Sequence, residues 1–541
     1  MTTQGKIKGP AWDQWAPILV VTVCALVALG AMFACLDKPL LDAHSFRQTT
    51  TSLTAFHMSR SGVELTYSTP VLGKPWQIPM EFPVFQTAVV LWHAVTPMGL
   101  DQSGKVVSIL FWILCLLPLW LLVSDLGFPR SAALLFVAVL LSSPLYLYWG
   151  RSFMIETTAL FFSLGMVALA YHGCVGNKPP ILALGLLFGC FAALVKITTW
   201  VTACGVGGLL LLVWASGHWR SRWPWLVAGS FALVLPVVPG KLWLNYADSV
   251  KVLNPFAREL IVASSANQSA WNFGTMEQKL NPATWSHIWN HITEGLLPPS
   301  PVLGPFLLPI VLVAGALMSP RRIPSILVFL AGFAAGPLIF TNLYFEHSYY
   351  WCANGVWLLL ALGCAISGIW EFRPQSSWPR WAALVATVAM ATSGFLVWNA
   401  KYLPVLRSLP TQEELAGAWT NPVQKLVPEK RTILIIGNDW NPNSLYYAER
   451  KGIAFPTAKW IPLPGPQLDE SLALLGPEDA LGAVVINEKL LAQENSAFFS
   501  SFLKKLGMSE EGIRTPFGVL FQALDLKFGG LPGGNGSKKI P

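Results

Sequence analysis

Residues Trp15–Leu36 read WAPILVVTVCALVALGAMFACL, an apolar run of 22 residues that contains no charged side chain. A helix of this length rises about 33 Å, which is enough to cross the hydrocarbon core of a bilayer. Lys6 and Lys8 precede the run, and no small-residue cleavage site follows it. We therefore predict a retained first membrane span and not a cleaved signal peptide.

The composition extends this prediction to most of the chain. Hydrophobic residues make up 53% of the 541 residues, charged residues make up only 12%, and the mean hydropathy is +0.51. An ordinary soluble protein has about 25% charged residues, so lipid must be the solvent for much of this surface. The composition excludes a string of soluble domains and predicts a polytopic α-helical membrane protein.

Ten further segments are apolar and long enough to be membrane spans, which makes eleven with the first. They are 104–123, 131–149, 156–173, 180–196, 199–216, 224–243, 302–318, 323–341, 352–370 and 380–398.

The segment Phe82–Pro97 is short for a crossing and decides the orientation of the chain. If it lies along the membrane surface, the basic loop residues share the cytoplasmic side with Lys6 and Lys8, as the positive-inside rule favours. If it crosses, every later loop inverts. We predict a surface-lying or re-entrant helix. The basic loop residues are Arg130, Lys178, Arg220, Arg222, Arg321, Arg322, Arg373 and Arg380.

This orientation places the N-terminus in the cytoplasm and the segment after residue 398 outside. Within that segment, Thr432–Gly437 and Leu481–Asn487 are typical of buried strands. We predict a transmembrane domain over 1–398, an extracytoplasmic α/β domain over 399–527 and a flexible tail over 528–541. The predicted outward loops and turns are 37–103, 150–155, 244–301 and 342–351, and the helical candidates between and after the strands are Asn443–Lys451, Leu468–Leu475 and Glu494–Leu506.

The outward segments carry the chemically useful side chains. Ionisable groups near the ends of spans are costly to bury, so their concentration at one face indicates a site. The cytoplasmic loops carry mainly scattered Arg and Lys. The outward elements are D-A-H-S-F-R-Q at 42–48, E-F-P at 81–83, R-S-F-M-I-E at 151–156 and H-S-Y-Y at 347–350.

The order and common sidedness of these elements resemble the GT-C integral-membrane glycosyltransferases, in particular the group of protein O-mannosyltransferases and aminoarabinose transferases. The stretch GNDWNP at 437–442, followed by Tyr446–Tyr447 and Arg450–Gly452, resembles bacterial members with an outward C-terminal domain. The resemblance covers most of the chain. It implies a GT-C fold and an enzyme that transfers a sugar from a polyprenyl phosphate to an acceptor hydroxyl or amine.

Such chemistry explains the residue types. A lipid-linked phosphate is already a leaving group, so the enzyme needs no sugar nucleotide and no glycine-rich phosphate loop. One carboxylate must take the acceptor proton, and cations or hydroxyls must stabilise the departing phosphate. A single displacement implies inversion at the anomeric carbon. The resemblance assigns the catalytic base to Asp42, lipid-phosphate binding to Arg47, Arg151, His347, Tyr349 and Tyr350, and sugar or acceptor binding to His44, Gln48, Glu81 and Glu156.

Asp42 also has a structural interpretation, because Asp is a favoured N-cap residue and Asp42 precedes the predicted helix Ser45–Met58. The aminoarabinose branch carries an Asp-Glu pair where this chain has His44–Ser45. That departure leaves Asp37 as a second candidate base.

The other candidates have ordinary alternatives too. Arg47 and Arg151 could be interfacial arginines directed at headgroups. Glu81 could be a solvated loop acid, and Glu156 could pair with Arg151. The aromatic residues after His347 could belong to an interfacial belt. Lys196, between two spans, is a further cation that could reach a lipid phosphate.

We predict no metal site and no required cofactor. His287 and His291 are spaced i,i+4 but lack the H-E-x-x-H glutamate, and Trp285 and Trp289 each precede one of them by two residues, which favours an interfacial helix over a metal site. A divalent metal on Asp42 and Glu156 stays open.

The predicted partners are the polyprenyl-phosphate sugar donor, the lipid bilayer and an acceptor glycan, lipid or protein, in a bacterial inner membrane. The net charge of +8 does not indicate nucleic acid, because no run of Lys and Arg exceeds two residues. Two other functions stay open. A polysaccharide polymerase or ligase would share the sidedness, and a transporter of lipid-linked saccharides would place polar groups near the bilayer midplane.

Overall fold

The computed structural model describes residues 12–263, 265–296, 304–372, 376–456, 463, 465–491, 495–526 and 537–539. The chain forms two compact units, and each is built from three separate segments. The first unit contains residues 1–36, 105–243 and 269–406, and the second contains 37–104, 244–268 and 407–541.

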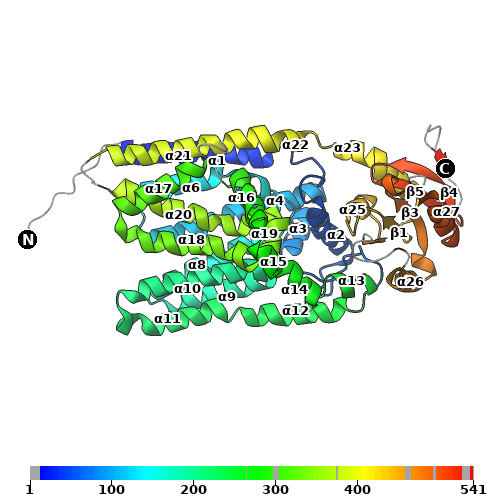
Figure 1. Ribbon diagram of the computed structural model, residues 1–541, viewed down its shortest axis with the longest axis horizontal. Coiled ribbons are helices and arrows are strands. Elements are labelled where there is room, and N and C mark those ends of the chain that lie inside the picture. Colours follow the sequence, from blue (N-terminus) through cyan, green and yellow to red (C-terminus); the bar gives the residue numbers. More distant parts are fainter. Residues whose placement is uncertain are drawn as a thin grey trace, which may run out of the picture. The chain divides into compact units, whose positions relative to one another are not determined.

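Helices dominate both units, and Figure 1 shows them with the labels used below. The longer helices are α1 (Trp12–Phe33), α2 (Ser45–Ser61), α3 (Val84–Val95), α4 (Leu100–Leu114), α5 (Leu116–Asp125), α6 (Arg130–Ser142), α8 (Glu156–Val175), α9 (Pro179–Val195), α10 (Ile197–Ser216), α11 (Trp219–Val234), α12 (Val237–Lys251), α16 (Pro282–Gly295), α17 (Gly304–Met318), α18 (Ile323–Ile339), α20 (Trp351–Glu371), α21 (Trp378–Val397) and α27 (Ser496–Lys505). The shorter α-helices are α7 (Pro144–Trp149), α13 (Pro255–Leu260), α14 (Ala266–Phe273), α15 (Met276–Leu280), α19 (Thr341–Glu346), α22 (Leu403–Arg407), α23 (Gln412–Leu415), α24 (Asn421–Leu426), α25 (Asn443–Ala448) and α26 (Pro466–Ala473).

The chain is a multi-pass membrane protein. Among the described residues, eight helices are long and apolar enough to cross a bilayer. They correspond to eight of the eleven predicted spans. The other three predicted spans coincide with shorter apolar helices, namely α6, α9 and the part of α17 from Leu307, and the predicted surface helix coincides with the 12-residue α3.

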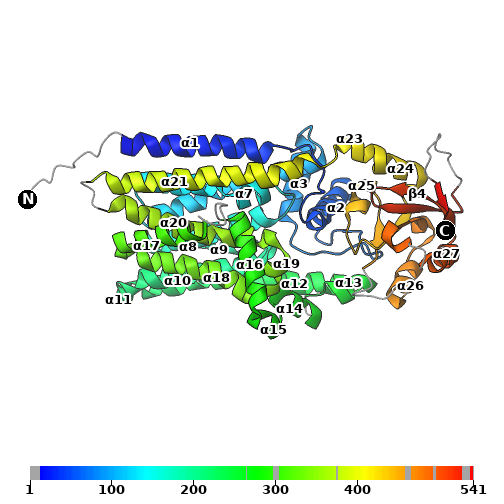
Figure 2. The ribbon, with the colours of Figure 1, turned by 45° about the horizontal axis from the view of Figure 1, so that its top comes forward.

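Helix α20 forms the centre of the first unit. Every residue of α20 from Trp351 to Trp370 is buried, and the helix packs against α6, α17, α18 and α21. Figure 2 shows the long helices of this unit running side by side. Small residues allow the close approach of α17 and α20, because a Cβ on Gly315 would lie 2.4 Å from Cα of Ala365.

The second unit contains a six-stranded sheet in the order β2-β1-β3-β5-β4-β6. The first three strands in that order are mutually parallel, and the last three pair antiparallel. The central strand β1 reads TILII and is buried throughout, as expected for a parallel strand covered on both faces. The strands are β1 (Thr432–Ile436), β2 (Gly452–Ala454), β3 (Leu481–Ile486), β4 (Met508–Thr515), β5 (Gly518–Ala523) and β6 (Ser537–Lys539).

Two segments that precede the sheet by more than 150 residues are built into the second unit. Gly73 donates its backbone N–H to Gly452, and Ala454 donates to Val71, so residues 70–73 extend the sheet beyond β2. Asn254 Nδ2 donates to the carbonyl of Gly73 at 2.9 Å, and its Oδ1 caps α13. The second unit therefore combines the C-terminal segment with parts of 37–103 and 244–301. The domain boundaries predicted from the sequence placed these two segments in outward loops of the transmembrane domain.

The fold class predicted from the sequence is confirmed. The predicted strands at 432–437 and 481–487 are β1 and β3, and the predicted helices between and after them are α25, α26 and α27. Strands β2, β4, β5 and β6 were not predicted. Strand β4 reads MSEEGIRT, a polar edge-type pattern that lacks an apolar run. Part of the predicted flexible tail forms β6, while 528–536 and 540–541 lie outside the described residues.

Candidate active site

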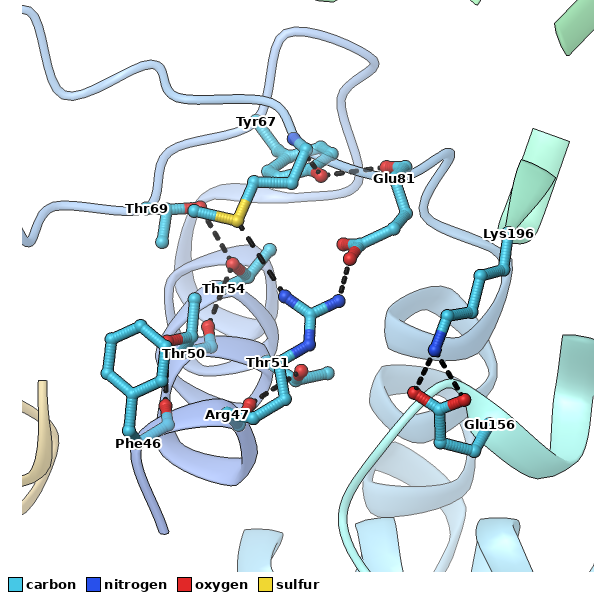
Figure 3. Close-up of polar contacts among 11 residues, drawn as sticks. Phe46, Arg47, Thr50, Thr51, Thr54, Tyr67, Thr69, Glu81, Glu156 and Lys196 are labelled. Carbon is cyan, nitrogen blue, oxygen red and sulfur yellow. Dashed lines mark hydrogen bonds and ion pairs between the residues drawn. The ribbon is translucent and has the colours of Figure 1, made fainter. Parts of the chain in front are cut away.

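Two helix ends in the first unit bring an acid and a base together. Glu156 is the first residue of α8, where the helix dipole favours a negative charge. Lys196 is the one extended residue between α9 and α10. Lys196 Nζ donates to both carboxylate oxygens of Glu156 at 2.6 Å (Figure 3). The side chains are only 1% and 9% exposed, so this is a buried ion pair.

Aromatic rings complete this group. Lys196 Nζ lies 4.0 Å from the ring centroid of Tyr350 and 5.3 Å from that of Tyr349. The His347 ring stacks on Tyr349 with centroids 5.1 Å apart. Both tyrosines belong to a 3-10 turn that leads into α20. We call Glu156, Lys196, His347, Tyr349 and Tyr350 the lysine cluster. Its buried cation and its hydroxyl-bearing rings are groups suited to an anionic ligand.

Arg151 also belongs to the first unit. It lies in the irregular turn between α7 and α8 and is 1% exposed. Its guanidinium lies 5.7 Å from the ring centroid of Tyr148. The alternative of an interfacial arginine directed at headgroups is therefore wrong, because protein surrounds the side chain.

In the second unit, the start of α2 carries the D-A-H-S-F-R-Q element. Gln48 is buried, and its Nε2 donates to Asp42 Oδ1 and to the carbonyl of Ala43 at 3.2 Å. His44 is the N-cap residue and has φ 52°, in the left-handed region that few non-glycine residues adopt. The N-cap interpretation of Asp42 is wrong: its side chain binds Gln48, and α2 has no side-chain cap. This strained turn at His44 lies between Asp42 and Gln48, the predicted sugar or acceptor contact that is hydrogen-bonded to the Asp42 carboxylate.

Arg47 lies one residue before Gln48 and forms an ion pair with Glu81 (Figure 3). Both side chains are largely buried, at 15% and 19% exposure, so Glu81 is not a solvated loop acid and Arg47 is not an exposed interfacial arginine. Tyr67 holds the segment of Glu81 in place, because its hydroxyl donates to the Glu81 carbonyl and accepts from the Met80 N–H, both at 2.7 Å. We call Asp42, Arg47, Gln48 and Glu81 the α2 cluster.

The C-terminal part of the second unit contacts the same helix start. Asn443, the first residue of α25, donates through Nδ2 to Ser45 Oγ at 2.9 Å and accepts from Thr49 Oγ1 at 2.6 Å. The Trp440 ring meets the Phe46 ring edge-on, with centroids 4.7 Å apart. Trp440 of the stretch GNDWNP, noted in the sequence for its resemblance alone, and the adjacent Asn443 thus support the residues on either side of Arg47.

The predicted histidine pair lies on α16, where the His287 and His291 rings are 4.6 Å apart and His287 also contacts Phe345. Over the described residues, no three His, Cys, Asp or Glu side chains group as metal ligands do.

Residues 83–243 match the model of a family described as dolichyl-phosphate-mannose-protein mannosyltransferase. The fold is similar to crystal structures of ArnT from Cupriavidus metallidurans. The structure of that protein bound to undecaprenyl phosphate has a TM-score of 0.58 and 14% identity, covering 93% of this chain and 97% of that one. The apo structure gives 0.50 and 15%, covering 94% and 98%. The chain has the fold of the GT-C membrane glycosyltransferases.

Two further comparisons complete this result. The apo oligosaccharyltransferase of Archaeoglobus fulgidus has a TM-score of 0.49 and 11% identity, covering 96% of this chain and 76% of that one. No curated protein matches the sequence. The family match over 83–243 includes Arg151, Glu156 and Lys196, so three buried charges of this chain lie in the matched segment.

Two features of these clusters were not predicted from the sequence, and a third was only noted. Lys196 was noted as a nearby cation, but its pairing with Glu156 joins residues 40 positions apart. The role of Asn443 and the buried Asp101, which accepts from Tyr446 and Tyr447, were missed. The available signal was the tyrosine pair at 446–447, because buried tyrosine hydroxyls need partners.

Proposed function

We propose that this protein is a glycosyltransferase that moves a sugar from a polyprenyl-phosphate donor to an acceptor, with inversion at the anomeric carbon. The observation that carries the proposal is the family match over 83–243, which contains the buried pair of Glu156 and Lys196. The likeness in fold to a protein crystallised with undecaprenyl phosphate supports the choice of donor.

In the second unit, we assign the proton transfer to Asp42. Its Oδ1 accepts from Gln48, which orients the carboxylate that would take the acceptor proton. Arg47 has the planar donor fork that suits a phosphate, and Glu81 orients it. His44 and Gln48 keep the predicted role of sugar or acceptor contacts.

In the first unit, we propose that cations and hydrogen-bonding side chains stabilise the negative charge that develops on the leaving phosphate. They are Lys196, Arg151, His347, Tyr349 and Tyr350. Glu156 was predicted as a sugar or acceptor contact. Because both of its oxygens already bind Lys196, we propose instead that it holds the ammonium in position. Such prepositioned donors stabilise charge that develops in a transition state.

We place the reaction at the outer face of a bacterial inner membrane, with the N-terminus in the cytoplasm and residues 399–541 outside. The distribution of basic loop residues supports this orientation. A reporter that is active only in the cytoplasm, fused after Lys401, should be inactive. We also propose that no cofactor is required, so transfer should persist in excess chelator.

The test uses the full-length protein in lipid nanodiscs. Undecaprenyl phosphate should bind and be detected by native mass spectrometry. A panel of isotopically labelled undecaprenyl-phosphate sugars should give label transfer to envelope fractions from a strain that lacks the gene. Failure of every donor both to bind and to transfer would overturn the proposal. Movement of the labelled lipid across vesicles without transfer would favour a transporter.

A further inference from the structure

A polar cavity lies entirely within the second unit, away from the α2 cluster. Its volume is about 620 Å³, within the range of roughly 300–1,000 Å³ that ligand sites occupy. Its walls come from the end of α2, the residues around the start of α4, the segment 412–420 and α25. Helices α2 and α25 lie side by side in Figures 1 and 2.

The cavity and Arg47 are at opposite ends of α2. Arg60 lines the cavity and lies thirteen residues after Arg47. A rise of 1.5 Å per residue separates them by about 20 Å along the helix axis. The cavity is therefore not part of the α2 cluster.

A buried carboxylate organises one wall. Asp101 is 7% exposed and accepts from Tyr446 Oη at 2.5 Å, Tyr447 Oη at 2.9 Å and Gln412 Nε2 at 2.7 Å. Burial, and then the charge of Asp101, raise the pKa of both tyrosines, so their hydroxyls remain proton donors. The wall therefore has a fixed hydrogen-bonding pattern, as a preorganised binding site has and an incidental packing defect lacks.

The charges of the lining argue against an anionic ligand. The acids Asp101 and Glu449 line the cavity, and Arg60 is the one arginine or lysine among its described lining residues. Arg60 is already bound to Glu449 at 2.9 Å and to Glu429 at 2.7 Å. A phosphate or carboxylate would meet two acids and a single arginine, so the Asp, Glu, Lys and Arg charges of the described lining are net negative.

The remaining lining suits a polyhydroxyl ligand. The amides of Gln102 and Gln412 carry donors and acceptors, and the hydroxyls of Ser59 and Thr420, which donate to the carbonyls of Phe56 and Tyr447, can still accept from sugar hydroxyls. The rings of Phe56 and Tyr446 meet at 89° with centroids 6.4 Å apart and provide apolar surface for a pyranose face. A peptide that binds by adding a strand would need a free strand edge, and no described lining residue belongs to a strand.

We propose that this cavity binds a neutral or amino-sugar saccharide, the glycan part of the acceptor. The identification of this saccharide as part of the acceptor rests on the proposed function. Saccharide binding by the cavity does not depend on transfer. It gives the C-terminal part of the second unit a direct part in acceptor choice.

The experiment uses two matched variants of the full-length protein in nanodiscs. Ser59 and Ser61 are both exposed serines at the end of α2, but only Ser59 lines the cavity. Ser59→Trp fills the cavity, and Ser61→Trp adds the same side chain outside it. The probes are N-acetylchitobiose, chitosan disaccharide, maltose and mannobiose, with digalacturonate as the anionic probe and a Ser/Thr-rich peptide as the protein-like one. Binding is followed by saturation-transfer difference NMR, and melting temperatures check the fold.

The parent and Ser61→Trp should bind at least one neutral or amino-sugar disaccharide, and Ser59→Trp should bind it at least tenfold more weakly. Equal binding by the two variants, binding by no disaccharide, or binding by the peptide or digalacturonate alone would overturn the proposal. Glycan binding without any transfer would refute the proposed function and keep the cavity assignment. Transfer with the same acceptor KM in both tryptophan variants would refute the cavity assignment and keep the proposed function.

Discussion

Lys196 donates to both carboxylate oxygens of Glu156 across 40 residues of sequence, and both side chains are buried. A buried ion pair is a poor source of net stability, because desolvation offsets most of the attraction. We therefore infer that the charge of Lys196 serves the ligand and not the stability of the first unit.

This interpretation predicts a separation of stability from activity. Glu156→Gln leaves a buried ammonium without its counter-charge and should lower stability by about 3–5 kcal/mol. The double variant Glu156→Gln with Lys196→Met should recover most of that stability, as judged by thermal melting, while donor binding stays lost. The control is Asp125→Asn, which removes the partner of His172 at the other end of α8 and should leave donor binding intact. A double variant that recovers donor binding with its stability would contradict the role of Lys196.

The sequence was informative about Glu156 and uninformative about its partner, for a physical reason. A glutamate at the start of an apolar helix stands out because its burial has a cost. The identity of the group that neutralises it depends on how α8 packs against α9 and α10, which no local pattern encodes. The same holds for Arg47 and Glu81. The loop sequence around Glu81 does not show that its carboxylate pairs with Arg47, and a solvated loop would leave the two side chains unpaired.

The membrane spans show the same difference between what a local sequence pattern predicts and what tertiary packing decides. Hydropathy located the long helices because each must satisfy its backbone in lipid without help from its neighbours. It did not show that residues 70–73 pair with β2, because that pairing consists of backbone hydrogen bonds between segments almost 400 residues apart. The grouping of 37–104 with the sheet could be seen only in three dimensions.

Asn443→Ala tests whether the C-terminal segment positions the start of α2. The variant loses the bonds to Ser45 and Thr49, which should lower stability by about 1–3 kcal/mol and reduce kcat more than donor affinity. Asn487→Ala is the control, since Asn487 binds Asn438 in the same part of the chain and not α2. Equal effects of the two variants on kcat would mean that Asn443 acts on stability alone.

Arg47→Ala should weaken binding of undecaprenyl phosphate by about tenfold or more, because a charge-assisted hydrogen bond contributes on the order of 1.5–3 kcal/mol. Native mass spectrometry of the protein in nanodiscs measures the bound fraction. Arg258→Ala removes an arginine of the same unit that forms an exposed pair with Glu470, and it should bind as the parent does. Unchanged binding by well-folded Arg47→Ala would remove Arg47 from the donor site.

His57, near the end of α2, gives a prediction for pH. Burial, and then the positive charges of Lys451 and Arg60, lower the pKa of His57 from 6.5 to about 4. Between these values the unfolded chain binds a proton that the folded chain does not, so stability is present above pH 6.5 and is lost as the pH falls toward 4. The loss should approach about 3 kcal/mol. His57→Gln should show a flatter dependence of melting temperature on pH than the parent, whereas Gln at the exposed His218 should not. Parallel curves for the parent and His57→Gln would contradict the shift.

Asp42→Asn should abolish transfer while donor binding and stability stay close to those of the parent. Asn keeps the shape of Asp, and its Oδ1 can still accept the hydrogen bond of Gln48, so the geometry of the α2 cluster is preserved. Asn cannot take a proton at neutral pH, and loss of a general base typically lowers the rate by about 10²–10⁴-fold. Single-turnover transfer of a labelled sugar measures that rate. Asp37→Asn is the control, because Asp37 is the second acid of the same segment and should be nearly inert when substituted. Because α2 has no side-chain cap, a stability defect in Asp42→Asn cannot be attributed to capping. Near-parental transfer by Asp42→Asn would move the base first to Asp37 and then to Glu156, whose release from Lys196 would then have to be part of the reaction.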